Sequence, residues 1–271
     1  MPDSLHIVCP HCDAVNRVPA GRLQAEPGPF LVMNLVESAV PSLPAATPAQ
    51  TGRARRLLMS ALFGLACSFA FAEQQNFQQL PPPQTSGGKP LMQALRDRST
   101  SREYKSTALP PQVLSNLLWA AFGINRPKTG GRTAPSAHDA QDIDIYVVTP
   151  ERVFLHDARR NVLETVVVKD IRALTGRQDF VVKAPVNLVY VADFNKFPRD
   201  SEEDKVFYSA ADAGFISQNV YLFCASEGLA TMVRAYIDKP ALARAMKLKP
   251  GQRIILAQSV GYPVAVAAAH R

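Results

Sequence analysis

An apolar run near residue 60 constrains the organisation of this chain more than any other feature. A flank with three arginines precedes the apolar residues 57–71, and the small-x-small sequence Ala-Phe-Ala comes directly before Glu73. These are the three parts of an export signal. The run is shorter than the about 20 apolar residues of a membrane-spanning helix, and it shows no amphipathic period. We therefore expect residues 53–72 to act as an export signal, with a buried core helix as the alternative.

This signal divides the chain into segments. Residues 24–52 are rich in Pro, Ala and Ser and lack a sustained period, which predicts a disordered linker. Residues 73–89 contain Gln, Pro and Gly without an apolar period, which predicts a flexible linker. The main folded domain is expected at 90–271. We expect a periplasmic or exported protein without a stable membrane span if the signal is cleaved, and a cytoplasmic one if an upstream start silences it.

The charge of the chain argues against a nucleic-acid partner. The formal net charge of +7 is spread along the sequence. A nucleic-acid-binding face needs Lys and Arg gathered on one surface. No such cluster is visible, so a mildly basic solvated surface is the preferred interpretation.

A Cys-x-x-Cys pair, Cys9 and Cys12, lies near the start of the chain. Residues 1–23 resemble the N-terminal zinc-binding segment of certain bacterial thioredoxins, in which a second Cys-x-x-Cys completes a tetrahedral site. Here the next cysteine is Cys67. We expect a non-functional fragment, with Cys9 and Cys12 as weak metal ligands; a working zinc or dithiol module is the alternative.

The pattern of residues 90–271 predicts helices alternating irregularly with strands. Helical spacing of apolar residues covers 90–98, 110–123, 204–229 and 239–248. Strands are expected within 142–150, 151–158, 181–194, 230–238 and 252–263. Leu117, Leu118 and Phe122 should face the core, and Gly228 should end the long helix. A strict strand-helix-strand repeat is missing, so the fold class is α+β.

Three polar side chains alternate just after the first helix. Arg98, Thr100 and Arg102 share one face if this segment is extended. Two guanidinium groups and a hydroxyl on one face can bind a phosphate through charge-assisted hydrogen bonds. A merely solvated face is the alternative for these residues on physical grounds alone.

Four motifs in order give residues 90–263 a resemblance to the nitroreductase superfamily of FMN-dependent oxidoreductases. The first is Arg98, Thr100 and Arg102, matching the family's Arg-x-Ser-x-(Arg/Lys) with Thr in place of Ser. The others are APSAHDAQ at 134–141, the Asp-Ala-Gly helix that ends in Gly228 and Leu229, and Gly-Tyr-Pro at 261–263. The sequences NLLWAAFGINR and GGRTAPSA are most similar to the branch of azoline-oxidising dehydrogenases.

The resemblance implies a three-layer fold with a mixed central sheet between helices, in a domain-intertwined homodimer that binds FMN in each interface cleft. The family transfers electrons or hydride by a ping-pong mechanism between NAD(P)H and a small organic substrate; another donor is expected if the protein is exported. No catalytic side chain is required, because the flavin carries the chemistry. The implied cofactor-binding residues are Arg98, Thr100, Arg102, Arg132, Ser136, His138, Gln141, Gly228 and Leu229.

Three residues are assigned no catalytic role. His138 and His156 are expected to be surface or loop histidines, and Cys224 a buried thiol within the long helix. A dimer that binds flavin without turnover is the non-enzymatic alternative.

Overall fold

The computed structural model describes residues 4–8, 15–19 and 76–264. The chain divides into two units, at 1–67 and 68–271. In the first unit, β1 (Ser4–Val8) and β2 (Val15–Pro19) pair as an antiparallel hairpin. Cys9, Cys12, the predicted linker at 24–52 and the predicted signal at 53–72 lie outside the described residues.

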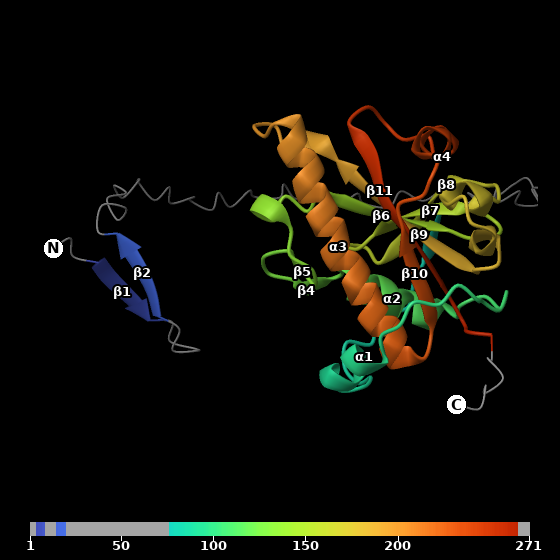
Figure 1. Ribbon diagram of the computed structural model, residues 1–271, viewed down its shortest axis with the longest axis horizontal. Coiled ribbons are helices and arrows are strands. Elements are labelled where there is room, and N and C mark those ends of the chain that lie inside the picture. The colour runs from blue at the N-terminus through green and yellow to red at the C-terminus, as the bar shows by residue number, and fades with distance from the viewer. Residues whose placement is uncertain (1–3, 9–14, 20–75, 265–271) are drawn as a thin grey trace, which may run out of the picture. The chain divides into compact units, whose positions relative to one another are not determined.

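A seven-stranded sheet forms the centre of the second unit (Figure 1). Its strands are β3 (Phe77–Gln79), β6 (Ile143–Val148), β7 (Val153–Asp157), β8 (Val162–Val167), β9 (Val186–Asp193), β10 (Ala230–Arg234) and β11 (Gln252–Gly261). Their order across the sheet is β10-β11-β9-β6-β7-β8-β3, and every pairing is antiparallel. The α+β class is therefore confirmed, whereas the mixed sheet is a correction: long connections link strands that still run antiparallel.

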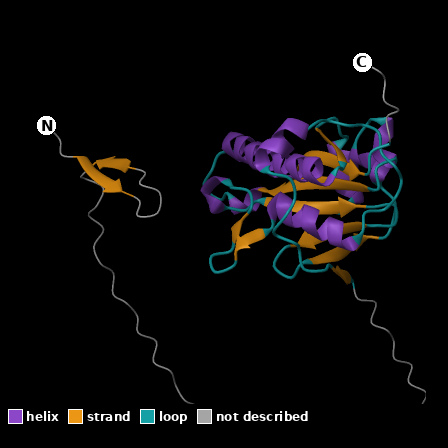
Figure 2. Ribbon diagram, turned by 90° about the horizontal axis from the view of Figure 1, so that it is seen from below, coloured by secondary structure: helices purple, strands orange, loops and turns teal. Residues whose placement is uncertain are grey.

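Helices cover both faces of this sheet and make three layers (Figure 2). The helices are α1 (Leu91–Asp97), α2 (Pro111–Phe122), α3 (Glu202–Glu227) and α4 (Lys239–Ala245). In β9, Leu188 and Tyr190 pack in the core under α2 and α3, whereas Val189 and Val191 pack in the core with α4. A strand with both faces buried has an uninterrupted apolar sequence, which is why NLVYVA correctly predicted a central strand.

Each of the four helices begins and ends within three residues of its predicted bounds. Leu117 and Leu118 of α2 are fully buried and Phe122 is 4% exposed, as predicted. The Ser201 side chain accepts a hydrogen bond from the Asp204 amide at the start of α3. Gly228 ends α3 in the left-handed conformation at φ 69°, where a glycine is least strained.

Two parts of the second unit correct the sequence prediction. The linker expected at 73–89 is part of the fold from residue 76 onward: β3 pairs with β8, and Leu80 is 1% exposed. Side chains of α2 bind this segment, with Ser115 Oγ donating to the carbonyl of Pro81 at 2.6 Å. Strand β8 and the small hairpin of β4 (Ile124–Arg126) and β5 (Gly131–Arg132) were also not predicted.

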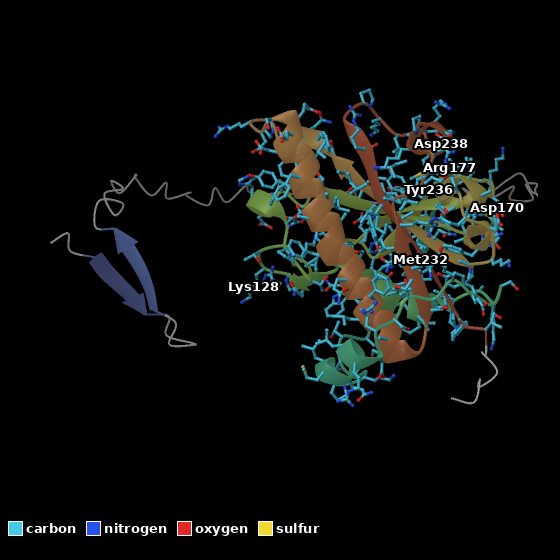
Figure 3. All side chains as sticks on the ribbon, viewed as in Figure 1. Lys128, Asp170, Arg177, Met232, Tyr236 and Asp238 are labelled. Carbon is cyan, nitrogen blue, oxygen red and sulfur yellow. The ribbon has the colours of Figure 1, made fainter. Side chains whose placement is uncertain are left out.

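A surface cluster fixes the loop between β10 and α4. Arg177 forms an ion pair of 3.5 Å with Asp238, and its guanidinium lies 5.6 Å from the ring centre of Tyr236. Asp238 also accepts a hydrogen bond from the Ala241 amide at the start of α4. Figure 3 labels Arg177, Tyr236 and Asp238 together at the α4 side of the sheet. Within the described ranges, no helix is both long and apolar enough to span a membrane.

Candidate functional site

The segment after α1 carries the first group of predicted site residues. The amide of Ser101 donates to the carbonyl of Thr231 in β10 at 3.0 Å, and the buried Tyr104 donates to the carbonyl of Ser101 at 2.7 Å. These bonds anchor the segment while Arg98, Thr100 and Arg102 remain exposed. This backbone allows the three side chains to lie on one exposed surface.

The two arginines of this segment keep their guanidinium groups available. Arg98 lies 5.5 Å from the ring centre of Tyr221 on α3, a cation–π contact that leaves its N–H groups free. Thr100 Oγ1 shares a hydrogen bond of 3.2 Å with the Tyr221 hydroxyl. Among residues 76–264, neither Arg98 nor Arg102 has a carboxylate within ion-pair distance. Such a surface can receive an anion.

Tyr221 is a residue that the sequence analysis missed. Its hydroxyl also accepts a hydrogen bond from the amide of Val233 in β10 at 3.1 Å, so it joins α3, β10 and the Arg98 segment. The sequence contains no signal for this role, because the contact with Thr100 spans 121 positions.

Gly228 and Leu229 form the turn from α3 into β10, the strand to which the Arg98 segment is hydrogen-bonded. Gly228 is exposed, and a Cβ built on it would meet no atom within 4 Å. Leu229 is 8% exposed and packs in the main core. A ligand at this turn can therefore contact the Leu229 backbone. The Leu229 side chain packs into the core and so supports the turn from inside the domain.

The second group of predicted residues lies in the loop between β5 and β6. His138, Asp139 and Gln141 adopt positive φ angles of 55°, 52° and 49°. Non-glycine residues rarely adopt this conformation, and here three occur within four positions. The His138 side chain is 61% exposed; its ring packs edge-on against Tyr208 at 5.3 Å.

Polar contacts within this loop stabilise its shape. Arg132 donates from Nε to Gln141 Oε1 at 2.8 Å and from Nη1 to the carbonyl of Phe122 at 3.0 Å. The Gln141 amide group donates to the carbonyl of Gly130, and Ser136 Oγ accepts from the Gln141 backbone N–H. Burial, with a smaller contribution from Arg159, lowers the pKa of Arg132. Arg132 and Gln141 thus act first as supports of the loop.

Asp212 on α3 connects this loop to the helix. Both of its carboxylate oxygens lie within hydrogen-bond distance of the Ala137 amide, at 3.0 and 3.2 Å. Burial, and next the contact with Asp142, raises the pKa of Asp212 to about 7, although the Ala137 amide opposes this shift. Asp212 is the Asp of the Asp-Ala-Gly motif, and the sequence gives no sign of its contact with the loop.

The two groups lie on opposite flanks of α3. The loop contacts the helix at Asp212, and the Arg98 segment contacts it at Tyr221, nine residues later. Nine residues are about two and a half turns and about 14 Å along the axis. The two groups of predicted residues are therefore well separated along the helix within a single chain.

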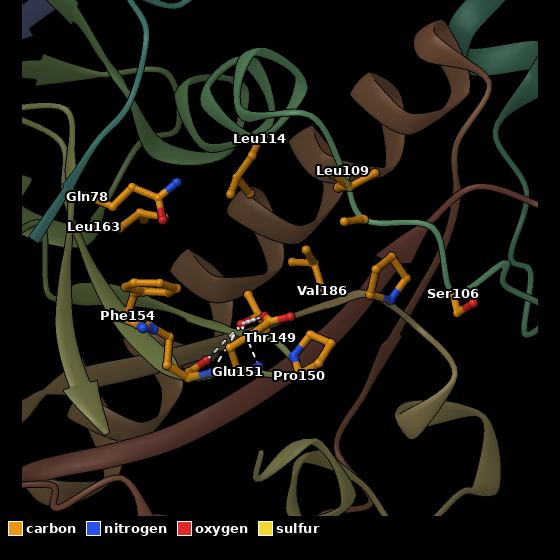
Figure 4. Close-up of a pocket in the computed structure, with 13 residues that line it drawn as sticks. Gln78, Ser106, Leu109, Leu114, Thr149, Pro150, Glu151, Phe154, Leu163 and Val186 are labelled. Carbon is orange, nitrogen blue, oxygen red and sulfur yellow. Dashed lines mark hydrogen bonds between the residues drawn. The ribbon is translucent and has the colours of Figure 1, made fainter. Parts of the chain in front are cut away.

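A cavity of about 500 Å³ lies elsewhere, between the segment before α2 and the β6–β7 turn (Figure 4). Its wall combines polar residues with the apolar side chains of Leu109, Leu114, Phe154, Leu163 and Val186. Thr149 and Glu151, joined by a hydrogen bond of 2.9 Å, lie at its edge. None of the nine predicted site residues contributes to this cavity, so it is separate from the predicted site.

The structure also places Cys224 and His156, two residues without an assigned role. Cys224 is buried, as predicted, and burial raises the pKa of its thiol. His156 lies on β7 rather than in a loop, and the residue is half-buried: its Nε2 atom is buried without a hydrogen-bond partner among the described residues, and burial lowers its pKa to about 4. Among those residues, no group of three or more potential ligands could hold a metal ion.

Comparison with known proteins identifies the family. The sequence model described as the nitroreductase family matches residues 95–262. This chain belongs to the nitroreductase family. A crystal structure from Ralstonia eutropha JMP134, described as a candidate nitroreductase, is 39% identical; the match covers 70% of this chain and 91% of that one, with a TM-score of 0.68.

Two further relatives and one N-terminal match complete the comparison. A candidate nitroreductase from Methanocaldococcus jannaschii is 30% identical over 159 residues, which are 55% of this chain and 80% of the relative. A chain of the E. coli microcin synthetase complex is 21% identical, with a TM-score of 0.53 over 76% of this chain and 84% of that one. That likeness shows the fold alone. Residues 8–28 match the N-terminal zinc-ribbon segment of thioredoxin 2.

Proposed function

We propose that this nitroreductase-family oxidoreductase binds FMN and transfers electrons by a ping-pong mechanism between a reduced donor and a small organic substrate. The observation that carries the proposal is the pair of exposed guanidinium groups, Arg98 and Arg102, without carboxylate partners among the described residues. They lie on a backbone fixed to β10, next to the exposed Gly228.

The residues present fit FMN. Arg98 and Arg102 would bind the phosphate, because guanidinium groups form charge-assisted hydrogen bonds to phosphate oxygens. Gly228 has no side chain to block a planar ring near the turn. When bound, FMN supplies hydride acceptance and donation, so the chain needs to provide position, charge and access.

The geometry of α3 supports a homodimer with the site at its interface. Since the two groups lie on opposite flanks of one helix, a second copy packed across α3 could place its loop against the Arg98 segment of the first. The outward face of α3 carries exposed aromatic side chains in the single chain: Phe207 is 68% and Phe215 49% exposed. Leu91 and Met92 of the neighbouring α1 are 62% and 71% exposed. Exposed apolar surface of this kind marks an interaction site.

The proposal also covers the electron donor and the cellular compartment of the protein. Reduced nicotinamide is the proposed donor if the protein stays in the cytoplasm. If residues 53–72 direct export, as we propose, another reduced donor must replace it, because the exported protein leaves the pool of free NAD(P)H.

A flavin-binding titration tests the proposal. The full chain and the variant R98Q/R102Q are titrated with FMN, followed by quenching of flavin fluorescence. Each lost charged hydrogen bond is worth about 1.5–3 kcal/mol, so we expect at least a tenfold weaker affinity. The exposed Arg244 of α4 supplies the matched control R244Q, which should bind as the parent does. Equal affinity for all three proteins, or no FMN binding by the parent, would contradict the proposal.

Turnover and dimerisation are measured on the same protein. Steady oxidation of NADH or of an artificial reduced donor with a nitroaromatic or quinone acceptor should occur; bound flavin that is never reduced would favour the non-catalytic alternative. The variant F215E should be monomeric by light scattering and should lose FMN. A monomeric F215E protein that binds FMN normally would exclude the interface site.

A further inference from the structure

Another cavity, of about 370 Å³, lies on the α4 side of the sheet. Strand β6 shows which side this is: Ile145 packs in the core under α2 and α3, whereas Tyr146 packs in the core with α4 and lines the cavity. Asp144 also lines it, because residues two apart on a strand share one face. Met246, directly after α4, and the loop that follows form another part of the wall. None of the predicted cofactor-binding residues contributes, so the cavity is separate from the proposed flavin site.

Two carboxylates line the cavity from neighbouring strands. Asp144 of β6 lies opposite Val191 of β9, which makes Asp193 its diagonal neighbour on the same face of the sheet. Gln252 of β11 lies opposite Asp193, and its Nε2 atom donates to Asp144 Oδ2 at 3.4 Å. The sheet therefore brings both carboxylates to one part of the wall.

Each of these carboxylates keeps one oxygen without a donor among the described residues. Asp193 Oδ1 accepts from the backbone and side-chain nitrogens of Asn195 at 3.0 and 2.8 Å, whereas Asp193 Oδ2 and Asp144 Oδ1 accept no hydrogen bond. Neither carboxylate forms an ion pair with those residues. Because both residues are half-buried, their charges are weakly screened and attract a cationic group in the cavity.

Tyr146 adds a third unused polar group. The residue is 5% exposed and lines the cavity, yet its hydroxyl forms no hydrogen bond of acceptable distance and angle with any described residue. The adjacent Gln252 side chain is engaged elsewhere, since it donates to Asp144 and accepts from the Lys249 amide at 2.9 Å. A buried hydroxyl without a partner is costly, so a ligand that bonds to this group is favoured.

The cavity also has basic residues at its outer side. Lys247 and Lys249 are exposed residues of the loop between α4 and β11, and both line the cavity. Neither forms an ion pair with a carboxylate of residues 76–264. The ammonium group of Lys196, the main positive charge near Asp144, is bound to the Gln141 carbonyl at 2.7 Å. Charges of both signs therefore surround one cavity without neutralising each other, and a ligand that carries both charges is complementary to it.

We propose that this cavity binds a small zwitterion with an aliphatic side chain, that is, a free amino acid. The ligand ammonium group has three N–H donors, which Asp144, Asp193 and the Tyr146 hydroxyl accept. Its carboxylate is bound by Lys247 and Lys249, and the volume suits a ligand at the small end of the usual range of about 300–1,000 Å³. The aliphatic side chain contacts the apolar wall of Leu155, Val166 and Met246.

Isothermal titration calorimetry of the full chain with L-leucine tests the proposal. Two probes each lack one charge: isoamylamine lacks the carboxylate of leucine, and isocaproate lacks its ammonium group. We expect saturable binding of leucine and at least about tenfold weaker binding of both probes, because charge-assisted hydrogen bonds are the strong ones. Absence of saturable leucine binding, or equal affinity for leucine and either probe, would overturn the proposal.

The variants Tyr146→Phe and Asp144→Asn locate the bound ammonium group. Each should weaken leucine binding by about fivefold or more, the effect of one lost hydrogen bond. Tyr146→Phe keeps the ring and remains informative if Asp144→Asn fails to fold. The matched controls Tyr236→Phe and Asp179→Asn alter exposed residues that do not line the cavity, and they should bind leucine as the parent does. Parent-like affinity of Tyr146→Phe, or of a folded Asp144→Asn protein, would refute the assigned contacts.

The double variant K247Q/K249Q tests the outer side of the cavity. It should bind leucine more weakly than the parent does and isoamylamine at least as well; unchanged leucine affinity would refute the role of the two lysines. Saturating FMN should leave leucine binding unchanged, because the cavity is on the α4 side whereas the Arg98 segment contacts α3. Competition between leucine and FMN would overturn the separate site. A protein that binds leucine but not FMN would refute the proposed function alone.

Discussion

Replacement of the buried Arg234 should cause a large loss of stability. Arg234 is 4% exposed at the end of β10, and no carboxylate among the described residues forms an ion pair with it. It donates to the carbonyl of Thr175 at 3.0 Å and to Thr175 Oγ1, Asn187 Oδ1 and Ser259 Oγ at 2.8 Å each. Burial lowers the pKa of Arg234 to about 10, so the guanidinium remains charged at neutral pH.

The expected magnitude follows from these four bonds. Hydrogen bonds to a charged group contribute about 1.5–3 kcal/mol each, but they are not additive. Removal of the guanidinium also removes the cost of burying a charge without a counter-ion. The variant R234A leaves several buried acceptors without a donor, and we expect a net loss of about 3–5 kcal/mol in the free energy of unfolding.

Urea denaturation of the FMN-free protein measures this loss without a contribution from ligand binding. The exposed R244A variant is the matched control and should change stability by less than about 0.5 kcal/mol. The variant R234M keeps much of the side-chain volume and separates packing from hydrogen bonding. A loss below about 1 kcal/mol in R234A would refute the reasoning, because the buried network would then contribute little.

Three further outcomes are expected. The variant L118A opens a cavity at a fully buried position of α2 and should cost about 2–5 kcal/mol in a urea titration. The variant G228A places a Cβ at φ 69°, where free space limits the cost to about 1 kcal/mol of backbone strain; a loss above about 3 kcal/mol would contradict this. His156, whose pKa falls to about 4 in the fold, gives stability that is complete above about pH 6.5 and is lost as the pH falls toward 4. The urea midpoint of H156Q should therefore depend less on pH over this interval than that of the parent.

The sequence predicted the regular parts of the fold because they are periodic. The buried positions of α2 and α3, the central strand β9 and the left-handed Gly228 all follow from local patterns. The pairing of β3 with β8 could not be predicted in the same way. Phe77–Gln79 contains only one apolar residue, and its strand conformation depends on a partner 83–87 positions later in the chain.

Only part of the candidate site could be predicted from the sequence. The alternation of Arg98, Thr100 and Arg102 predicted exposed polar side chains after the first helix, and all three residues are exposed. The supports of that site are long-range contacts, such as Tyr221 with Thr100 and Asp212 with Ala137. Because these pairs are distant in the sequence and neither carries a recognisable motif for the contact, the geometry on the two flanks of α3 became visible only in the structure.

The position of β3 determines where anything attached upstream would enter the domain. Strands β3 and β10 are the two ends of the sheet, six strand spacings apart, or about 29 Å at the usual interval. Gly228 and the Arg98 segment lie at the β10 end. A reporter or surface linker joined directly before Asn76 would thus enter at the opposite side of the sheet, so that the protein could be immobilised with the Arg98 surface accessible to solution.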